Sequence, residues 1–334
     1  MEQSVNDVFS EQIMQFGFEK FAITYDSIKK LGEFENYIFQ GLKETKEVII
    51  RFTHSSHRSY EQILSEIDWV QFLKKQDINV YKHFHSIEGR LLEKIEAVDG
   101  SFFYICCYEK LPGKQITLKD VTDYPNYIEM WGAAIGKIHK ATRLYRPTTV
   151  VKRLEWYEEE LINAEKFILV GEEHAANYCN QIVSEIKKLK KDESNYGLIH
   201  SDLHRGNFTI EENELYMFDF DDCSYHWFAS DIAIPLYYTM LTRSYEIEEG
   251  KQDFANYFMN HFLQGYRYFH EVSLEQLKTI PLFLKLRDIT LLSVMYKKYN
   301  FEYLMEREKR LFDNVYERIQ RQDLIVELDW NEFC

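Results

Sequence analysis

The sequence is poor in residues that break or cross-link a chain. Its 334 residues include only 13 Gly, 5 Pro and 5 Cys. So few helix breakers favour long regular elements joined by short turns. The cysteines form no CxxC pair, and two of them, Cys106 and Cys107, are adjacent. This pattern excludes a disulfide framework and predicts reduced, buried thiols in a cytoplasmic protein.

Long apolar runs and a basic charge balance are also missing. The most apolar segments, 229–241 and 280–296, are interrupted by charged residues or proline and fall short of the roughly 20 residues of a membrane span. The polar, acidic start of the chain is unlike a secretory signal. The formal net charge of −15 argues against nucleic acid or a membrane as partner. It is compatible with a cationic substrate.

Apolar and aromatic residues are plentiful. Hydrophobic residues make up 45% of the chain and aromatic residues 16%, which is enough for a packed core and excludes global disorder. The length leaves room for two lobes with one cleft, or for one large domain with appendages.

The first third of the chain mixes strand-like and helical patterns. A short helix is expected over about 4–16, and apolar residues at helical spacing predict a longer helix over about 60–75. β-like runs are expected at 37–42, 47–53, 90–96 and 101–108. These patterns predict a small sheet with one helix packed on it.

Helical patterns dominate after the turn signal LPGK at 111–114. Helices are expected around 128–138, where Gly132 and Gly136 would permit close packing, and over 155–190 and 253–320. Two short β-like runs, 208–210 and 215–220, flank a turn. We therefore predict an α+β protein with a small β-rich lobe (1–110) and a large α-rich lobe (111–334).

The segments LIHSDLHRGNF (198–208) and YMFDFDD (216–222) carry the chemistry. Phosphoryl transfer from ATP needs a carboxylate that orients the attacking hydroxyl and accepts its proton, and oxygen ligands that hold Mg²⁺ against the phosphates. Asp202 and Asn207 lie on one compact loop, and the following hairpin would bring Asp219 beside them. The spacing indicates the catalytic loop of a kinase.

Other readings of the two histidines on this loop are open. His200 and His204 are four residues apart, a spacing that suits zinc on a helix, but Gly206 and the loop composition argue against a helix here. His200 is expected to be a structural residue that hydrogen-bonds within the loop. His204 either fills space or touches substrate.

The pattern His200, Asp202, Asn207 and Asp219 resembles the aminoglycoside phosphotransferase and choline kinase family. The downstream Asp231 resembles the aspartate that braces the catalytic loop in that family. The resemblance implies a two-lobed, protein-kinase-like fold with the active site in the cleft between the lobes.

The resemblance also implies residue roles. Asp202 would be the catalytic base or orienting carboxylate, and Asn207 and Asp219 would bind Mg²⁺. The residues implied in ATP binding belong to the nucleotide loop, the following strand and helix, and the hinge: Gly32, Asn36, Arg51, Glu66, Glu109 and Leu111. Arg51 would neutralise phosphate through its forked guanidinium group, and Glu66 would be the partner of Arg51. Backbone groups of the hinge would pair with adenine.

We predict an ATP-dependent, Mg²⁺-dependent phosphotransferase that acts on a hydroxyl of a small molecule, aminoglycoside-like or amino-alcohol-like. The alternatives are a Ser/Thr protein kinase of the bacterial stress-response kind and a catalytically silent nucleotide-binding protein. For a cationic acceptor, the candidate pocket residues are acidic: Asp221, Asp222, Glu155, Glu158 and Glu159. The sequence says nothing about oligomeric state.

Overall fold

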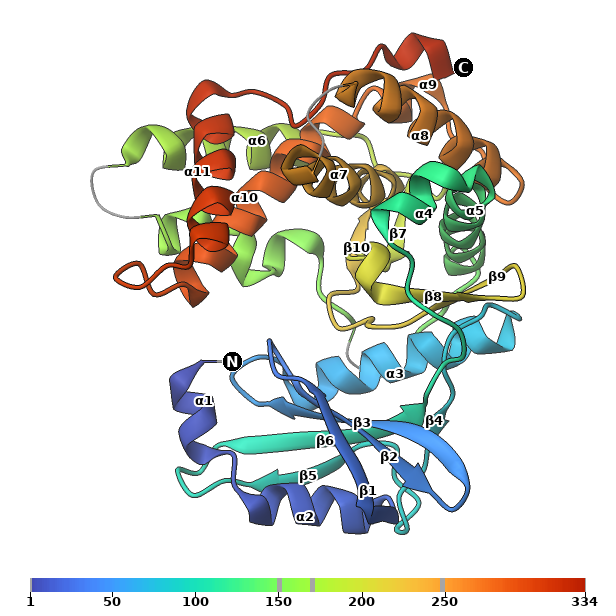
Figure 1. Cartoon of the computed structure of the whole chain (residues 1–334), viewed down its shortest axis with the longest axis vertical. Coiled ribbons are helices and arrows are strands. Elements are labelled where there is room, and N and C mark those ends of the chain that lie inside the picture. Colours follow the sequence, from blue (N-terminus) through green and yellow to red (C-terminus); the bar gives the residue numbers. More distant parts are fainter. Residues whose placement is uncertain (1, 149–151, 169–171, 247–249, 334) are drawn as a thin grey trace. The chain divides into compact units, whose positions relative to one another are not determined.

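The computed structural model describes residues 2–148, 152–168, 172–246 and 250–333 (Figure 1). The chain forms two compact units. The first contains Met1–Gly113, Tyr145–Arg153 and Tyr216–Asp221, and the second contains Lys114–Leu144, Leu154–Leu215 and Asp222–Cys334. The chain thus divides at Gly113 rather than at residue 110, and two later segments join the first unit. One reason is that Met217 donates its backbone N–H to the carbonyl of Asn79 (2.9 Å).

The first unit is an antiparallel sheet with helices on both sides (Figure 1). The strands follow the order β1-β2-β3-β6-β4, and β5 also pairs with β6. The elements are α1 (Gln3–Val8), α2 (Glu11–Lys20), β1 (Ile23–Gly32), β2 (Tyr37–Lys43), β3 (Lys46–His54), α3 (Tyr60–Lys75), β4 (His83–Phe84), β5 (Glu93–Glu96) and β6 (Phe102–Glu109).

Helix α3 has the predicted bounds, and its start has a clear cause. Ser59 accepts a hydrogen bond from the backbone N–H of Gln62 (3.2 Å), whose side chain accepts one from the N–H of Ser59 (2.9 Å). This reciprocal cap satisfies two N–H groups that a helix start leaves open. Ile63, Trp69 and Leu73 of the apolar stripe are fully buried.

Two N-terminal features differ from the predictions. The single helix expected over 4–16 is two helices, because Ser10 caps α2 by accepting from the N–H of Ile13 (3.4 Å), and Phe9 between them stacks on Tyr37. Strand β1 was not predicted. It is an edge strand with mostly exposed residues and two register irregularities, so no alternating apolar pattern marks it.

The second unit is mainly helical and carries two two-stranded sheets, β7 with β10 and β8 with β9. The helices and short 3₁₀ turns are α4 (Leu118–Asp123), α5 (Pro125–Thr142), η1 (Trp156–Glu158), η2 (Glu160–Ile162), η3 (Ala164–Lys166), α6 (Glu173–Lys187), η4 (Arg205–Asn207), α7 (Phe228–Glu246), α8 (Lys251–Arg267), α9 (Leu274–Leu277), α10 (Ile280–Lys298), α11 (Glu306–Arg321) and η5 (Trp330–Phe333). The strands are β7 (Tyr196–Ile199), β8 (Phe208–Glu211), β9 (Glu214–Met217) and β10 (Ser224–Trp227).

The close helix packing expected at Gly132 and Gly136 is confirmed. A Cβ atom at Gly136 would come within 2.6 Å of the carbonyl oxygen of Tyr266 on α8, and one at Gly132 would overlap the carbonyl oxygen of Phe262. Only glycine lets α5 approach α8 this closely.

The helix expected over 155–190 is wrong in its first half. That stretch forms three 3₁₀ turns, and a regular helix begins only at Glu173. Glutamates at 155, 158, 159 and 160 would repel one another on one helix. The turns also bury Trp156, which stacks on His226 at a ring distance of 5.2 Å.

None of the described helices is both long and apolar enough to span a membrane. The cysteines at positions 106, 107, 179 and 223 are free and buried, as expected.

Candidate active site

Strand β7 leads directly into the loop with the candidate catalytic residues. Asp231, buried at the start of α7, accepts hydrogen bonds from the backbone N–H groups of His200 (3.0 Å) and Ser201 (2.8 Å). Ser201 has a φ of 68°, a left-handed conformation that a non-glycine residue keeps only when its surroundings hold it. Asp231 therefore fixes the turn just before Asp202.

His139 completes this support. It is fully buried, with Nε2 3.3 Å from Asp231 Oδ2 and Nδ1 2.8 Å from the hydroxyl of Tyr266. Burial acts to raise the pKa of Asp231, but the hydrogen bond and charge of His139 outweigh it and the pKa lies below its usual value. His139 is thus a structural residue.

Both carboxylate oxygens of Asp202 are engaged. Oδ1 accepts a hydrogen bond from the guanidinium of Arg287, and Oδ2 lies 3.1 Å from Asn207 Nδ2 and 3.4 Å from His204 Nε2. Burial acts to raise the pKa of Asp202, but the charges of Arg287 and His204 outweigh it and lower the pKa to about 2. Asp202 is therefore ionised at neutral pH and held in one orientation.

The two loop histidines serve the loop itself. The Nδ1 atom of His204 accepts from the N–H of Gly206 (2.9 Å), and its Nε2 atom faces Asp202. The Nδ1 atom of His200 accepts from the N–H of Asp202 (3.3 Å). The residues between them form no helix, so the helical zinc spacing does not arise.

In the first unit, the structure pairs Arg51 with Glu66, as the family resemblance implied. Arg51 Nη1 and Nη2 donate to the two carboxylate oxygens of Glu66 at 2.9 and 2.8 Å. Both side chains are buried, with 2% and 0% exposed. The fork of Arg51 is therefore directed at Glu66 rather than open to a phosphate.

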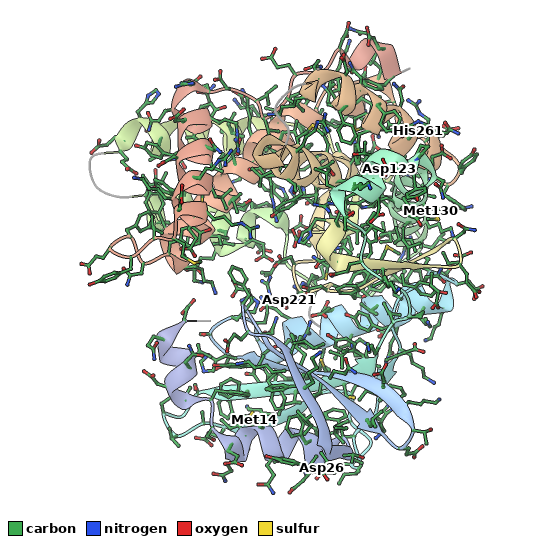
Figure 2. All side chains as sticks on the ribbon, in the orientation of Figure 1. Met14, Asp26, Asp123, Met130, Asp221 and His261 are labelled. Carbon is green, nitrogen blue, oxygen red and sulfur yellow. The ribbon has the colours of Figure 1, made fainter. Side chains whose placement is uncertain are left out.

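Asp221 lies at the centre of a second buried polar cluster in the same unit (labelled in Figure 2). Its Oδ2 accepts from His57 Nε2 (2.5 Å) and Asn36 Nδ2 (3.2 Å), and Arg58 Nε lies 3.7 Å from Oδ1. Burial acts to raise the pKa of Asp221, but His57 and Arg58 outweigh it and lower the pKa well below its usual value. Asp221 is therefore held by residues of the first unit. This corrects the prediction that Asp221 lines an acceptor pocket.

The candidate nucleotide loop joins β1 to β2. Gly32 ends β1, and a Cβ atom there would meet no neighbour, so its backbone is accessible. Asn36 is buried and its Oδ1 accepts from Thr53 (2.6 Å), while its amide reaches Asp221. Polar side chains rather than further glycines thus fix the second half of this loop.

The candidate hinge residues follow the last strand of this sheet. Glu109 ends β6 and donates its backbone N–H to the carbonyl of Lys82 (2.9 Å). Leu111 lies in the irregular segment that follows, just before Gly113 with its φ of 88°.

The candidate metal ligands offer oxygen donors, which Mg²⁺ prefers. The Asn207 amide nitrogen donates to the Asp202 backbone carbonyl (2.8 Å) and carboxylate, which leaves the amide oxygen as the ligand atom. Asp219, in the first unit, is an exposed carboxylate with a left-handed φ of 65°, next to the buried Phe220. Among the residues that the structure describes, no three His, Cys, Asp or Glu side chains group around a metal site. Amide and carboxylate oxygens are both donor types that suit a cation which the nucleotide phosphates also bind.

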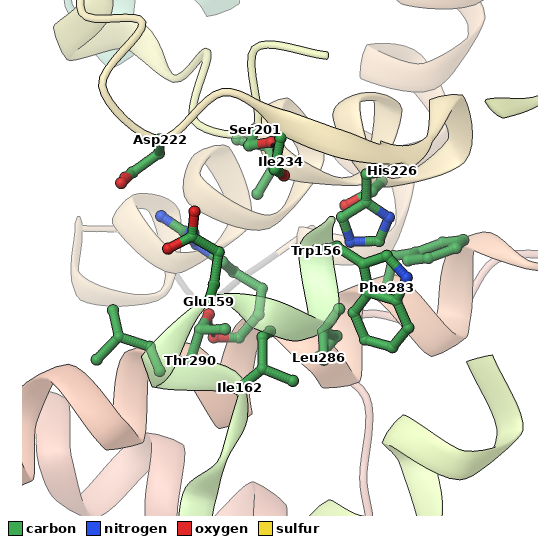
Figure 3. Close-up of a pocket in the computed structure, with 14 residues that line it drawn as sticks. Trp156, Glu159, Ile162, Ser201, Asp222, His226, Ile234, Phe283, Leu286 and Thr290 are labelled. Carbon is green, nitrogen blue, oxygen red and sulfur yellow. Dashed lines mark hydrogen bonds between the residues drawn. The ribbon is translucent and has the colours of Figure 1, made fainter. Parts of the chain in front are cut away.

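A pocket in the second unit lies beside the catalytic loop (Figure 3). In this view Trp156, His226 and Phe283 gather at one side, and Glu159 and Asp222 lie toward the other. Its further lining residues are Leu161, Ile162, Ser201, Ser224, Ser230, Ile234, Leu286, Arg287 and Thr290. Burial lowers the pKa of His226 to about 3, so this ring is neutral and adds to an apolar, aromatic wall.

Two of the acidic residues expected in an acceptor pocket, Asp222 and Glu159, do line it. Glu155 instead accepts a hydrogen bond from the hydroxyl of Tyr196, and Glu158 caps the N–H of Glu155 at 2.8 Å. These two glutamates stabilise local turns.

Sequence reasoning missed the pocket residues Trp156 and Arg287 and the Asp221 partner His57. Arg287 is 85 positions from Asp202, and no local motif marks it. Trp156 carried one signal, a large aromatic residue in an acidic run. Its indole N–H is buried and has no hydrogen-bond partner within the described ranges.

Comparison with known proteins adds independent evidence. The chain matches the Phosphotransferase enzyme family over residues 27–270. It is 30% identical to an amicoumacin kinase of Bacillus subtilis (strain 168), over 97% of this chain and 94% of that protein. It is also similar to the solved structure of amicoumacin kinase hAmiN in complex with AMP-PNP, Ca²⁺ and Ami. That similarity has a TM-score of 0.94 and 31% identity and covers 100% of both chains.

More distant structures share the fold. A microcompartment-associated aminopropanol kinase has a TM-score of 0.74 at 18% identity, covering 94% of this chain and 98% of that one. The choline kinase LicA from Streptococcus pneumoniae has a TM-score of 0.62 at 16% identity, with coverage of 93% and 99%.

These similarities confirm the predicted kinase-like α+β fold and the predicted activity, ATP-dependent phosphorylation of a small-molecule hydroxyl. They do not favour a protein kinase or a silent nucleotide-binding protein. The chain belongs to the Phosphotransferase enzyme family.

Proposed function

We propose that this kinase phosphorylates a hydroxyl of amicoumacin or a closely related molecule, with Asp202 as the residue that orients this hydroxyl. Similarity along the whole chain to an amicoumacin kinase supports this acceptor. The observation that carries the proposal is the pocket beside Asp202, because Arg287 both lines the pocket and donates to the Asp202 carboxylate.

The chemistry of this pocket suggests what part of an acceptor it binds. Trp156, His226 and Phe283 offer a flat apolar wall, and Glu159 and Asp222 offer negative charge. An acceptor with a flat apolar group and an ammonium group would satisfy both sides. The buried indole N–H of Trp156 could donate a hydrogen bond to a polar atom of the substrate.

In the proposed reaction, the acceptor oxygen forms a bond to the γ-phosphorus of ATP while the bond between this phosphorus and the β–γ bridging oxygen breaks. ADP leaves with the bonding electron pair. The hydroxyl proton moves toward the carboxylate of Asp202. A carboxylate with a pKa of about 2 is a weak base, so Asp202 chiefly orients the hydroxyl and takes the proton late.

The enzyme uses ATP and a divalent cation, and we propose that the cation is Mg²⁺. Asn207 and Asp219 would hold it through their oxygen atoms, and it would supply positive charge to the phosphates.

For ATP, we propose that the first unit is the nucleotide-binding lobe and the second the catalytic and acceptor-binding lobe. Arg51 would contribute positive charge, and Glu66 would fix its side chain. Gly32 and Asn36 would form the phosphate loop, and backbone groups of Glu109 and Leu111 would pair with adenine. Because ATP is the phosphate donor, we place the enzyme in the cytoplasm.

The acceptor can be tested by incubating purified enzyme with ATP, Mg²⁺ and one candidate acceptor at a time. The panel contains amicoumacin, 1-aminopropan-2-ol, choline, spectinomycin and a generic Ser/Thr protein substrate. ADP release and product mass are both recorded. We expect mono-phosphorylated amicoumacin at the highest kcat/KM. Turnover of an amino alcohol alone, or of the protein alone, would refute this acceptor.

A further inference from the structure

Arg287 connects the catalytic loop to the pocket wall. It stands on α10, its Nη2 donates to Oδ1 of Asp202, and its side chain lines the pocket of Figure 3. Its side chain is 19% exposed and that of Asp202 is 17% exposed, so this ion pair lies at the border of the solvent. A pair in this position can be reached by substrate.

Tyr238 on α7 fixes the Arg287 side chain. Nε of Arg287 donates to the hydroxyl of Tyr238 (3.0 Å), and Nη2 donates to the same oxygen. The guanidinium carbon also lies 4.8 Å from the centre of the Tyr238 ring. Ring and hydroxyl together remove most of the rotational freedom of a long side chain, which an ion pair at the surface normally keeps.

Tyr238 also contacts the other donor that flanks Asp202. The rings of Tyr238 and His204 lie 4.8 Å apart, and His204 Nε2 is 3.4 Å from Asp202 Oδ2. Arg287 and His204 therefore approach the two oxygens of one carboxylate, and both contact the same tyrosine. These contacts form a closed ring around Asp202.

A second set of contacts involves Tyr237 and Asp288, the sequence neighbours of Tyr238 on α7 and of Arg287 on α10. These contacts join helices and do not reach the catalytic loop. Tyr237 donates to Asp288 Oδ1 (2.7 Å), and Arg318 Nη2 binds the same carboxylate at 2.5 Å. Asp288 is buried, and this set joins α7, α10 and α11. The helices are thus already joined without Arg287, whose own partner is the catalytic loop.

We propose that Arg287, braced by Tyr238, is a positioning residue that aims the Asp202 carboxylate at the acceptor hydroxyl. The inference rests on the proposed role of Asp202. A carboxylate that loses one of its fixed donors can rotate, and a misplacement of about an ångström costs roughly 10²-fold in rate. Because the effect falls on the chemical step, kcat should fall while the KM for ATP changes little.

The test compares Arg287→Ala, Arg287→Lys, Tyr238→Phe and Lys285→Ala with the wild type, by kinetics with ATP and amicoumacin and by thermal melting. We expect Arg287→Ala to lose about 10²-fold in kcat and to recover in part when millimolar guanidinium chloride is added. Arg287→Lys should be intermediate, because an ammonium cannot bridge Tyr238 and Asp202 as a planar fork does. Tyr238→Phe should lose less, because it keeps the ring. Lys285 lies on the same helix over the ring of Tyr178 (5.6 Å), and its variant should behave as wild type.

The outcomes separate this inference from the proposed function. Acceptor-free ATP hydrolysis is measured in parallel. If wild type does not phosphorylate amicoumacin, that acceptor is refuted. The rates of ATP hydrolysis by wild type and the Arg287 variants then still test the role of Arg287. An Asp202→Asn variant at wild-type rate would refute the site as a whole. If Asp202→Asn is impaired but Arg287→Ala and Arg287→Lys both keep kcat within about threefold, the inference alone is wrong. The inference is also wrong under a second outcome. In that outcome Arg287→Ala loses both activity and its melting transition, Arg287→Lys keeps the full kcat, and guanidinium restores no activity to Arg287→Ala.

Discussion

Arg51 and Glu66 form a two-pronged ion pair in the interior of the first unit, with nitrogen–oxygen distances of 2.9 and 2.8 Å. Burial acts to lower the pKa of Arg51, but the charge of Glu66 outweighs it and keeps the guanidinium charged. The pair fastens α3 to strand β3. Removal of one partner leaves a buried charge without compensation, which is far more costly than the loss of an exposed pair.

We therefore expect Glu66→Gln to lower the free energy of unfolding by about 3–5 kcal/mol. Urea unfolding followed by circular dichroism measures the change. The matched control is the pair of Glu88 with Arg90, whose side chains are 37% and 60% exposed; its Glu88→Gln variant should change little. Equal effects of the two substitutions would contradict a structural role for the Arg51–Glu66 pair.

Asp231 should make stability depend on pH in one direction. Its pKa is lowered in the folded protein, so it stabilises the fold above the ordinary aspartate value of about 3.9, and this contribution is lost as pH falls through the folded pKa. Asp231→Asn should be less stable than wild type at pH 7, because three donors, two of them buried, lose a charged acceptor. The difference in melting temperature between wild type and Asp231→Asn should become smaller below about pH 4. The control is Asp123→Asn, at an exposed aspartate at the end of α4 (labelled in Figure 2). A gap that stays constant with pH would be incompatible with an ionised Asp231.

The acidic side of the pocket should bind the cationic part of the acceptor. Glu159→Gln and Asp222→Asn should each raise the acceptor KM several-fold, and salt should raise the wild-type KM by screening the same attraction. The KM for ATP should change less. Glu158→Gln is the control, because Glu158 is exposed and caps a local turn. If all three variants keep the wild-type acceptor KM and its salt dependence, the negative charge of Glu159 and Asp222 does not contribute to acceptor binding.

Asp219 should account for the metal-dependent part of nucleotide binding. Saturating ATP at about 100 times its Kd stabilises a protein by about 2.7 kcal/mol. Wild type should show a larger thermal shift with ATP and Mg²⁺ than with ATP alone, and Asp219→Ala should lose that difference because the cation loses its charged ligand. Asp221→Asn is the comparison: it should lower the melting temperature but keep the Mg²⁺-dependent difference. Equal Mg²⁺ effects in wild type and Asp219→Ala would remove Asp219 from the metal site.

Local patterns predicted much of the fold and the centre of the site. The bounds of α3 follow from an apolar stripe and a reciprocal cap at Ser59 and Gln62, which are neighbours in sequence. Asp202 and Asn207 are five positions apart on one loop, and the 3₁₀ turn η4 folds this loop so that their side chains come within hydrogen-bond distance (3.1 Å). The resemblance to a known family supplied the partnership of Arg51 and Glu66.

The features that sequence reasoning missed depend on tertiary packing. Arg287 and Tyr238 reach the catalytic loop only because α7 and α10 pack side by side, and neither residue belongs to a motif. Strand β1 is an exposed edge strand without the alternation that marks a half-buried strand. The turns around Trp156 form because a buried indole and repelling glutamates override a helical composition.

The most direct test of the account is the mass of the product formed from amicoumacin, ATP and Mg²⁺ by wild type and by Asp202→Asn. We predict that wild type forms amicoumacin carrying one phosphate together with ADP, and that Asp202→Asn, still folded and still stabilised by ATP, forms it at least about 10²-fold more slowly. Phosphorylated amicoumacin formed at the wild-type rate by Asp202→Asn would contradict the catalytic site. Absence of the product with wild type would contradict the acceptor.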